Sequence, residues 1–159
     1  MSKHATSDAT NRFQYLLRVR YAECDAQLVV FNARYADYVD IAATEYFRAL
    51  FGGYQYLLSQ GLDNQVVKLT TEWKSPARFD DVLSITVATS HIGNSSFTLA
   101  IEFREFLTNR AIARSEIVYV MVSTDKYQKT PIPEKFRQAL AHQAKGVVVD
   151  HAGVEYHPH

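Results

Sequence analysis

VRYAECDAQLVVFNARYADYVDIAATEYFRAL, residues 19–50, is the most informative stretch of the chain. Its pattern predicts a short strand, a loop that carries Asp25, and then a long helix. A helix start offers backbone N–H groups without intrahelical partners and the positive end of the helix dipole. A carbonyl bound there is polarised while a neighbouring carboxylate attacks it or activates water. The stretch therefore indicates acyl-transfer chemistry.

The long helix is predicted over residues 33–50, where apolar residues recur at spacings of three, four and seven. Its middle carries two small residues, Ala42 and Ala43, which would let a sheet approach closely. Asn32 is placed to cap the first turn with its side-chain oxygen, and a pair of glycines to end the last turn. The apolar segment 28–31, just before the helix, is expected to be buried.

The pattern after this helix changes to a period of two. Alternating apolar and polar residues predict strands at 66–73, 82–90, 97–104 and 112–123. A first strand is predicted at 15–21, and a short last helix is expected to begin at Pro133 or Glu134. This order indicates an α+β fold with a five-stranded antiparallel sheet wrapped around one long central helix. Such a sheet has free edges, which proteins cover by pairing or burial, so dimerisation is inferred.

The composition favours one globular domain, because 47% of the 159 residues are hydrophobic and aromatic residues are abundant. Seventeen basic residues balance seventeen acidic ones, so no overall charge draws the chain to nucleic acid or an anionic membrane. No apolar run reaches the roughly 18 residues that cross a bilayer, and no secretory signal is expected. The single cysteine, Cys24, fits a reducing compartment, and a cytoplasmic location is expected.

Several motifs occur in the order found in one known family. They are VRYAECD, VVFN and ARY within residues 19–50, EWKSPARFDDVLSITV at 72–87, IGNSSFTL at 92–99 and IPEKFRQAL at 132–140. Together they resemble the acyl-CoA thioesterases of the hotdog fold, in particular the 4-hydroxybenzoyl-CoA thioesterase group. The resemblance implies a hotdog thioesterase domain at 12–145, between a flexible N-terminus at 1–11 and a C-terminal tail at 146–159.

The resemblance also implies an assembly. In this family two protomers join their sheets edge to edge, and acyl-CoA binds at the subunit interface, so a homodimer or homotetramer is expected. No cofactor is implied, since CoA is part of the substrate. No metal is implied either, and the sequence contains no H-x-x-x-H or Cys/His set that would hold one.

Asp25 falls on the family's catalytic carboxylate, and the family's spacing makes the main-chain N–H of Asn32 the oxyanion donor. On spacing alone, the ordinary interpretation of Asp25 is a loop residue that ends a strand and caps a turn. Whether it acts as nucleophile or general base stays open. Leu28 stands where relatives usually have glycine, and Phe31 favours an apolar substrate pocket. Tyr35 matches a family tyrosine and is expected to pack the loop.

The phosphates of CoA need basic side chains or backbone donors at the rim of the site. Lys74, Arg78 and Lys129 are candidates, and for each a solvated surface charge is the ordinary alternative. Ser95 and Ser96 are further candidates for phosphate or pantetheine, because they lie in the hairpin where relatives place basic residues.

The resulting prediction is an acyl-CoA thioesterase that hydrolyses a thioester to a free acid and CoA. A hotdog dehydratase would need a catalytic histidine, and the Asp25 loop and central helix contain none. A non-catalytic acyl-CoA binding or regulatory protein of the same fold stays open as the alternative, with Leu28 as a lesion in the active loop. Cys24 is interpreted as a packing residue, and Glu23 has no assigned role.

Overall fold

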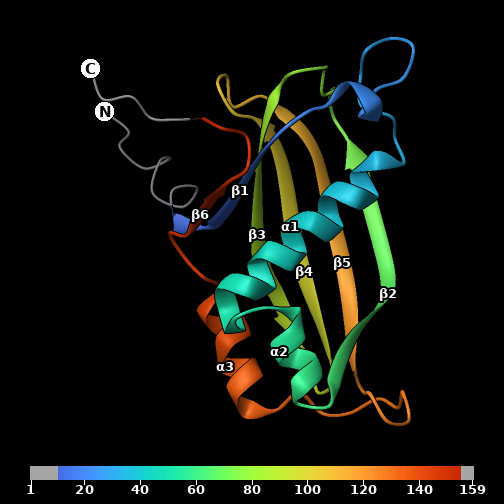
Figure 1. Cartoon of the computed structure of the whole chain (residues 1–159), viewed down its shortest axis with the longest axis vertical. Coiled ribbons are helices and arrows are strands. Elements are labelled where there is room, and N and C mark those ends of the chain that lie inside the picture. The colour runs from blue at the N-terminus through green and yellow to red at the C-terminus, as the bar shows by residue number, and fades with distance from the viewer. Residues whose placement is uncertain (1–10, 155–159) are drawn as a thin grey trace.

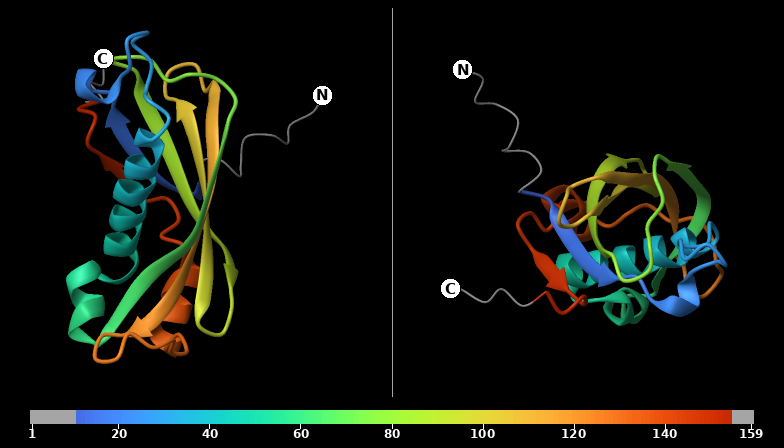
Figure 2. Two further views of the ribbon diagram at one scale, coloured as in Figure 1. Left: turned by 90° about the vertical axis from the view of Figure 1, so that its right-hand side faces the viewer. Right: turned by 90° about the horizontal axis from the view of Figure 1, so that it is seen from above.

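The computed structural model describes residues 11–154 (Figure 1). The strands are β1 Phe13–Arg18, β2 Leu62–Trp73, β3 Val82–Ile92, β4 Ser96–Glu105, β5 Ala111–Ser123 and β6 Val148–Asp150. The helices are a 3-10 turn η2 Tyr21–Glu23, α1 Arg34–Phe51, α2 Tyr54–Ser59 and α3 Glu134–His142. Helix α1 lies in the concave face of the curved sheet, and α2 and α3 lie together at one end (Figure 1, Figure 2). No helix in the described part of the chain is long and apolar enough to span a bilayer.

The sheet differs from the prediction in the number and direction of its strands. Its order is β2-β5-β4-β3-β1-β6, and every pair is antiparallel except β1 with β6. The sheet is therefore six-stranded and mixed, which corrects the expected five-stranded antiparallel sheet. The sixth strand has only three residues, too few to show a period of two, and it lies in the stretch 146–159 that was expected to be a tail.

β6 fastens the described part of that stretch to the sheet. Val149 pairs with Tyr15 in parallel register, and the N–H of His151 donates to the carbonyl of Leu16 at 2.9 Å. Residues 155–159 lie outside the described residues, as does the predicted N-terminal segment up to residue 10.

α1 buries one face against the sheet, through Tyr35, Tyr38, Val39, Ala42, Ala43, Tyr46 and Phe47. Ala42 and Ala43 are 0% and 1% exposed and belong to the core that the helix shares with the strands. Further along, the ring of Phe47 meets Phe97 and Tyr119 edge to face, with centroids 5.9 and 5.4 Å away. These contacts fix both the position of the helix and its rotation.

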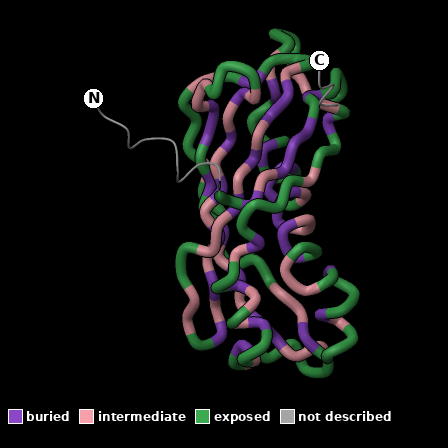
Figure 3. Tube along the Cα trace, turned by 90° about the vertical axis from the view of Figure 1, so that its left-hand side faces the viewer, coloured by how far each residue is buried: buried purple, intermediate pink, exposed green. Residues whose placement is uncertain are grey.

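β3, β4 and β5 show the predicted alternation, whereas β2 is exposed along most of its length. β4 alternates along its whole length between half-buried and buried residues, and buried and less buried segments alternate along the chain in Figure 3. The buried set of β4, which includes Phe97, Leu99, Ile101 and Phe103, belongs to the same core as the apolar face of α1. One face of the sheet thus forms the core with the helix.

The structure confirms the predicted C-terminal end of α1 and contradicts its predicted N-cap. Gly52 follows the last turn with a φ of 90°, and its N–H donates to the carbonyl of Arg48 at 3.0 Å, which confirms the predicted glycine end. The predicted cap was wrong, because Ala33 occupies the N-cap position and no side chain bonds the first turn. The N–H groups of Arg34, Tyr35 and Ala36 donate instead to the backbone carbonyls of Phe31, Asn32 and Ala33.

The close contact at Ala42 predicts a steric effect. Ala42→Leu is expected to lower the free energy of unfolding by about 1–3 kcal/mol, because the added carbons must displace helix or sheet. Ala49→Leu is the matched control, since Ala49 is exposed on the same helix and should change stability little. Urea unfolding of both variants tests this, and equal effects would contradict the close contact.

Candidate active site

Asp25 lies in a tight hairpin that precedes α1. Cys24 and Val30 form an antiparallel bridge, and the N–H of Asp25 donates to the carbonyl of Val29 at 2.9 Å. The N–H of Leu28 donates back to the carbonyl of Asp25 at 3.0 Å, and Leu28 has a φ of 60°. These features match a three-residue loop whose last residue is left-handed, the position at which glycine is favoured. We refer to residues 23–31 as the Asp25 hairpin.

The carboxylate of Asp25 is exposed and only partly used by the turn. Its Oδ1 accepts the N–H of Gln27 at 2.8 Å, while no donor among residues 11–154 reaches Oδ2. The ordinary turn role is therefore present, and it leaves one carboxylate oxygen free. A free, solvent-facing carboxylate oxygen is what a nucleophile or general base requires.

The second arm of the hairpin leads into the helix start, where two backbone N–H groups are open. The N–H of Phe31 donates to the carbonyl of Glu23 at 3.0 Å, which ends the pairing of the two hairpin arms. The next two N–H groups, of Asn32 and Ala33, have no acceptor among the described residues. Open N–H groups at the positive end of a helix dipole are suited to stabilising a developing oxyanion.

A second segment, residues 75–81, supports the hairpin from its other side. The N–H of Val30 donates to the carbonyl of Ala77 at 2.9 Å, and the N–H of Phe79 donates to the carbonyl of Leu28 at 3.0 Å. The hairpin is thus hydrogen-bonded both to its own first arm and to this loop.

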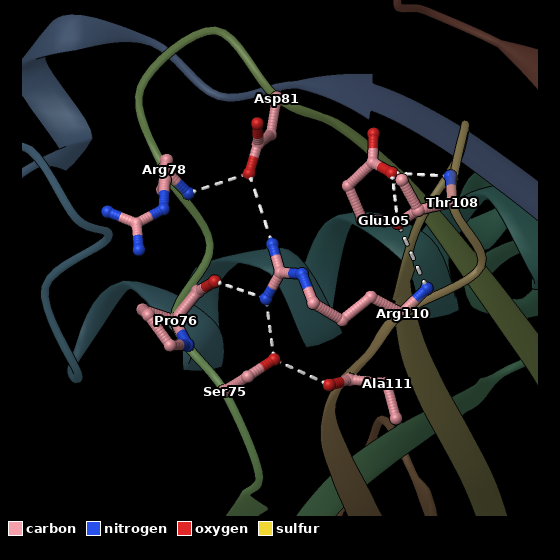
Figure 4. A network of polar contacts seen from close by, with 8 residues as sticks. All are labelled: Ser75, Pro76, Arg78, Asp81, Glu105, Thr108, Arg110 and Ala111. Carbon is pink, nitrogen blue, oxygen red and sulfur yellow. Dashed lines mark hydrogen bonds and ion pairs between the residues drawn. The ribbon is translucent and has the colours of Figure 1, made fainter.

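Arg110 anchors the 75–81 loop (Figure 4). Its Nη1 donates to Ser75 Oγ at 2.6 Å and to the carbonyl of Pro76 at 2.8 Å, and its Nη2 lies 3.7 Å from Asp81 Oδ2. Asp81 also accepts the backbone N–H of Arg78, whose guanidinium points away from this network. Arg78 is therefore exposed beside the hairpin, as a phosphate contact would need.

The prediction that segment 28–31 is buried was wrong. Within it, Leu28 and Phe31 are 48% and 53% exposed, and only Val30 has its side chain in the core. The hairpin projects beyond the end of the sheet, so one side chain reaches inward and its neighbours do not. Tyr21 and Phe79, also exposed, pack edge to face beside it with centroids 5.9 Å apart. The Asp25 hairpin and the residues beside it thus expose several apolar side chains.

Tyr35 is buried in the first turn of α1. It is 2% exposed, and its ring meets those of Tyr38, Trp73 and Phe103 at centroid distances of 5.9, 5.8 and 5.5 Å. Burial raises the pKa of the Tyr35 hydroxyl, which therefore stays neutral. This is the placement expected of a residue that packs the loop, and a contact with substrate stays a prediction.

Cys24 lacks the properties of a nucleophile. Burial and the charges of Glu23 and Asp25 raise the pKa of its thiol, and its Sγ lies 3.6 Å from the carbonyl of Arg20. A protonated thiol is a poor nucleophile, which agrees with the packing interpretation.

The other CoA candidates are scattered over the chain. Lys74 is exposed near Arg114 on the sheet, and Lys129 forms an isolated bridge with Val122. Ser95 and Ser96 precede or begin β4, whose ten residues span about 30 Å and end on the side of the Asp25 hairpin. A single chain therefore does not bring the serines to Asp25.

Three residues near the hairpin gave no signal in the sequence. Glu23 is a buried carboxylate, Tyr38 a buried tyrosine beside it, and Arg110 the anchor of the 75–81 loop. Each acts through a contact distant in sequence, so spacing alone offers no pattern. The charge of Glu23 two positions before Asp25 was the only available clue.

Comparison with known proteins agrees with this geometry. Residues 19–140 match the thioesterase-like superfamily. The chain belongs to that family. It is 34% identical to the Escherichia coli acyl-CoA thioester hydrolase YbgC over 127 residues, which cover 79% of this chain and 92% of that one.

Solved structures support the same fold. A gentisyl-coenzyme A thioesterase superimposes with a TM-score of 0.70 and 26% identity over 78% of this chain and 98% of its own. A Staphylococcus aureus protein solved in complex with CoA superimposes with a TM-score of 0.79 over 88% of each chain, at 12% identity, a likeness in fold alone. The predicted hotdog thioesterase resemblance is confirmed.

The left-handed backbone of Leu28 predicts that glycine at this position gives a more stable protein than alanine. Leu28→Gly is expected to exceed Leu28→Ala in free energy of unfolding by about 0.5–1 kcal/mol. Both changes remove the half-exposed side chain, but only glycine removes the Cβ that opposes a φ of 60°. Thermal or urea unfolding of the pair measures the difference, and a more stable alanine variant would contradict it.

Proposed function

We propose that this protein hydrolyses acyl-CoA thioesters to a free acid and CoA, with Asp25 as the reacting carboxylate. One observation supports this most directly: the free oxygen of Asp25 and the open N–H groups of Asn32 and Ala33 flank one hairpin. Family membership and the thioester hydrolase activity named for YbgC support the same reaction.

Two routes use this arrangement. In one, Asp25 Oδ2 attacks the thioester carbonyl carbon, the C–S bond breaks, CoA leaves as its thiolate, and water hydrolyses the anhydride that remains. In the other, Asp25 takes a proton from water, whose oxygen attacks the same carbon, and the thiolate leaves. In both, the N–H of Asn32 donates to the carbonyl oxygen as negative charge develops on it.

The surroundings of Asp25 favour an apolar acyl group. Leu28 and Phe31 are exposed on the same hairpin as the carboxylate, and Tyr35 is buried in the first turn of α1. Arg78 offers a guanidinium at the rim, suited to a phosphate of CoA. Lys74 and Ser96 are more distant candidates, whereas Ser95 is only 4% exposed, and either serine would need a second chain to approach Asp25.

A homodimer through the β2 edge would supply that second chain. β2 is an edge strand of twelve residues, whereas β6 at the opposite edge has three. β2 exposes several large apolar side chains, namely Val66 at 53%, Val67 at 59%, Leu69 at 38% and Trp73 at 50%. A long apolar edge of this kind is covered in most proteins, so we propose that two β2 strands pair.

Light scattering tests this assembly. The parent is expected to have at least twice the mass of one chain, and Leu69→Lys to shift it toward the monomer, because a desolvated charge opposes pairing. Val148→Lys on the other edge strand is the control, since Val148 is 55% exposed and should not affect the mass. A monomeric parent, or dissociation only by Val148→Lys, would contradict the proposed interface.

The catalytic proposal is tested by Asp25→Asn. CoA release, followed with a thiol reagent on short, medium, long and aromatic acyl-CoAs, is expected to fall by about 100-fold or more. The amide oxygen still accepts the N–H of Gln27, so the loop and substrate binding should persist. Asp125→Asn is the matched control, because exposed Asp125 also accepts a backbone N–H, from Lys126, far from the hairpin.

Either of two outcomes would count against the proposal. Parental turnover in Asp25→Asn would remove Asp25 from the reaction. Acyl-CoA binding without turnover in the parent would favour a non-catalytic acyl-CoA binding protein, the second candidate function. One observation favours this second function. Leu28 is left-handed and half-exposed at a position where relatives usually have glycine.

A further inference from the structure

A buried carboxylate lies at the start of the Asp25 hairpin, and the reaction proposed above does not use it. Glu23 is 6% exposed, and its Oε1 accepts the N–H of Arg20 at 2.8 Å. Its Oε2 accepts Arg20 Nη2 at 3.0 Å. Burial opposes ionisation of Glu23, but the hydrogen bonds from Arg20 outweigh it and lower the pKa, so the group is charged.

Tyr38 of α1 lies against this carboxylate. The tyrosine is 1% exposed, and its hydroxyl has no regular hydrogen bond within the described part of the chain. Burial and the negative charge of Glu23 raise the pKa of Tyr38, so the hydroxyl keeps its proton. A buried hydroxyl without a partner is costly, and Glu23 is the acceptor beside it.

A cavity of about 260 Å³ opens at this contact. Glu23 and Tyr38 line it, together with Tyr15 and His151. The hydroxyl of Tyr15 is already bonded to His151 Nδ1 at 2.9 Å, which leaves Tyr38 as the hydroxyl in need of an acceptor. The cavity leaves space beside the side chains of Glu23 and Tyr38.

We propose that Glu23 is a positioning residue, which accepts a hydrogen bond from Tyr38 and thereby fixes the Asp25 hairpin to helix α1; this rests on the function proposed above. Glu23 lies two residues before Asp25, and its carbonyl accepts the N–H of Phe31, the residue before Asn32. A shift of Glu23 therefore moves the carboxylate and the oxyanion donor together. Misplacement of reacting groups by about 1 Å can cost roughly 100-fold in rate.

Two tyrosines of α1 allow a matched test. Tyr46 is as buried as Tyr38, but its hydroxyl bonds Thr89 Oγ1 at 2.7 Å, away from the hairpin. Tyr38→Phe is expected to lower kcat about tenfold or more, with KM within about threefold and a loss of thermal stability similar to that of Tyr46→Phe. Tyr46→Phe is expected to lower the melting temperature by about 2–4 °C and leave kcat unchanged, because it breaks a satisfied hydrogen bond.

Two substitutions of Glu23 provide a second test of the positioning role. Glu23→Gln keeps an oxygen that can accept from Arg20 and Tyr38, so its kcat should lie between those of the parent and Glu23→Ala. A merely structural role would instead lower stability in these variants without this order of kcat values.

Amide hydrogen exchange at Phe31 tests the positioning role of Glu23 independently of turnover. Because the Phe31 N–H bonds to Glu23, Tyr38→Phe should speed its exchange about tenfold, whereas Tyr46→Phe should not. If the parent turns over acyl-CoA, parental kcat in Tyr38→Phe, or an equal loss in Tyr46→Phe, overturns the positioning role. If the parent turns over none, the proposed function fails, and unchanged exchange at Phe31 in Tyr38→Phe overturns the positioning role independently.

Discussion

The close packing of α1 into the curved sheet is the constraint on which the rest of the structure depends. Ala42 and Ala43 allow the helix backbone to approach the strands, and the rings around Phe47 prevent it from sliding or turning. A helix held in this way presents its first turn at a fixed place. The open N–H groups of Asn32 and Ala33 therefore keep their direction without a capping side chain.

The Asp25 hairpin is built against that fixed helix start, and its backbone is held from several sides. One arm bonds to the other, the 75–81 loop bonds to Val30 and Leu28, and Arg110 anchors the loop in turn. A left-handed leucine is tolerated where the surroundings determine the backbone so fully. Local strain and a half-used carboxylate at one loop are common features of reactive sites.

Much of this architecture could be predicted from periodicity. The spacing of apolar residues indicated α1, and alternation indicated β2 to β5, because each of these elements is long enough to show its period. β6 has three residues and shows none. The predicted cap by Asn32 was wrong. Asparagine is able to cap a helix, but the path of the chain into the helix decides whether its side chain reaches the first turn.

The candidate site was predictable only in part. Asp25 is exposed on a loop beside the helix start, as its place in the sequence suggested. The exposure of Leu28 and Phe31 and the distance of Ser95 from the hairpin were not predictable, since both depend on how the sheet ends are arranged in space. Glu23 and Tyr38 meet across fifteen positions of sequence, and no local pattern marks such a contact.

The most direct test of the account is a crystal structure with a non-hydrolysable acyl-CoA analogue. If Asn32 is the oxyanion donor, the carbonyl oxygen of the analogue will lie within about 3 Å of the Asn32 nitrogen, with the carbonyl carbon facing Asp25 Oδ2. An analogue bound with its carbonyl remote from the helix start, or directed to other side chains, would exclude these roles of Asn32 and Asp25.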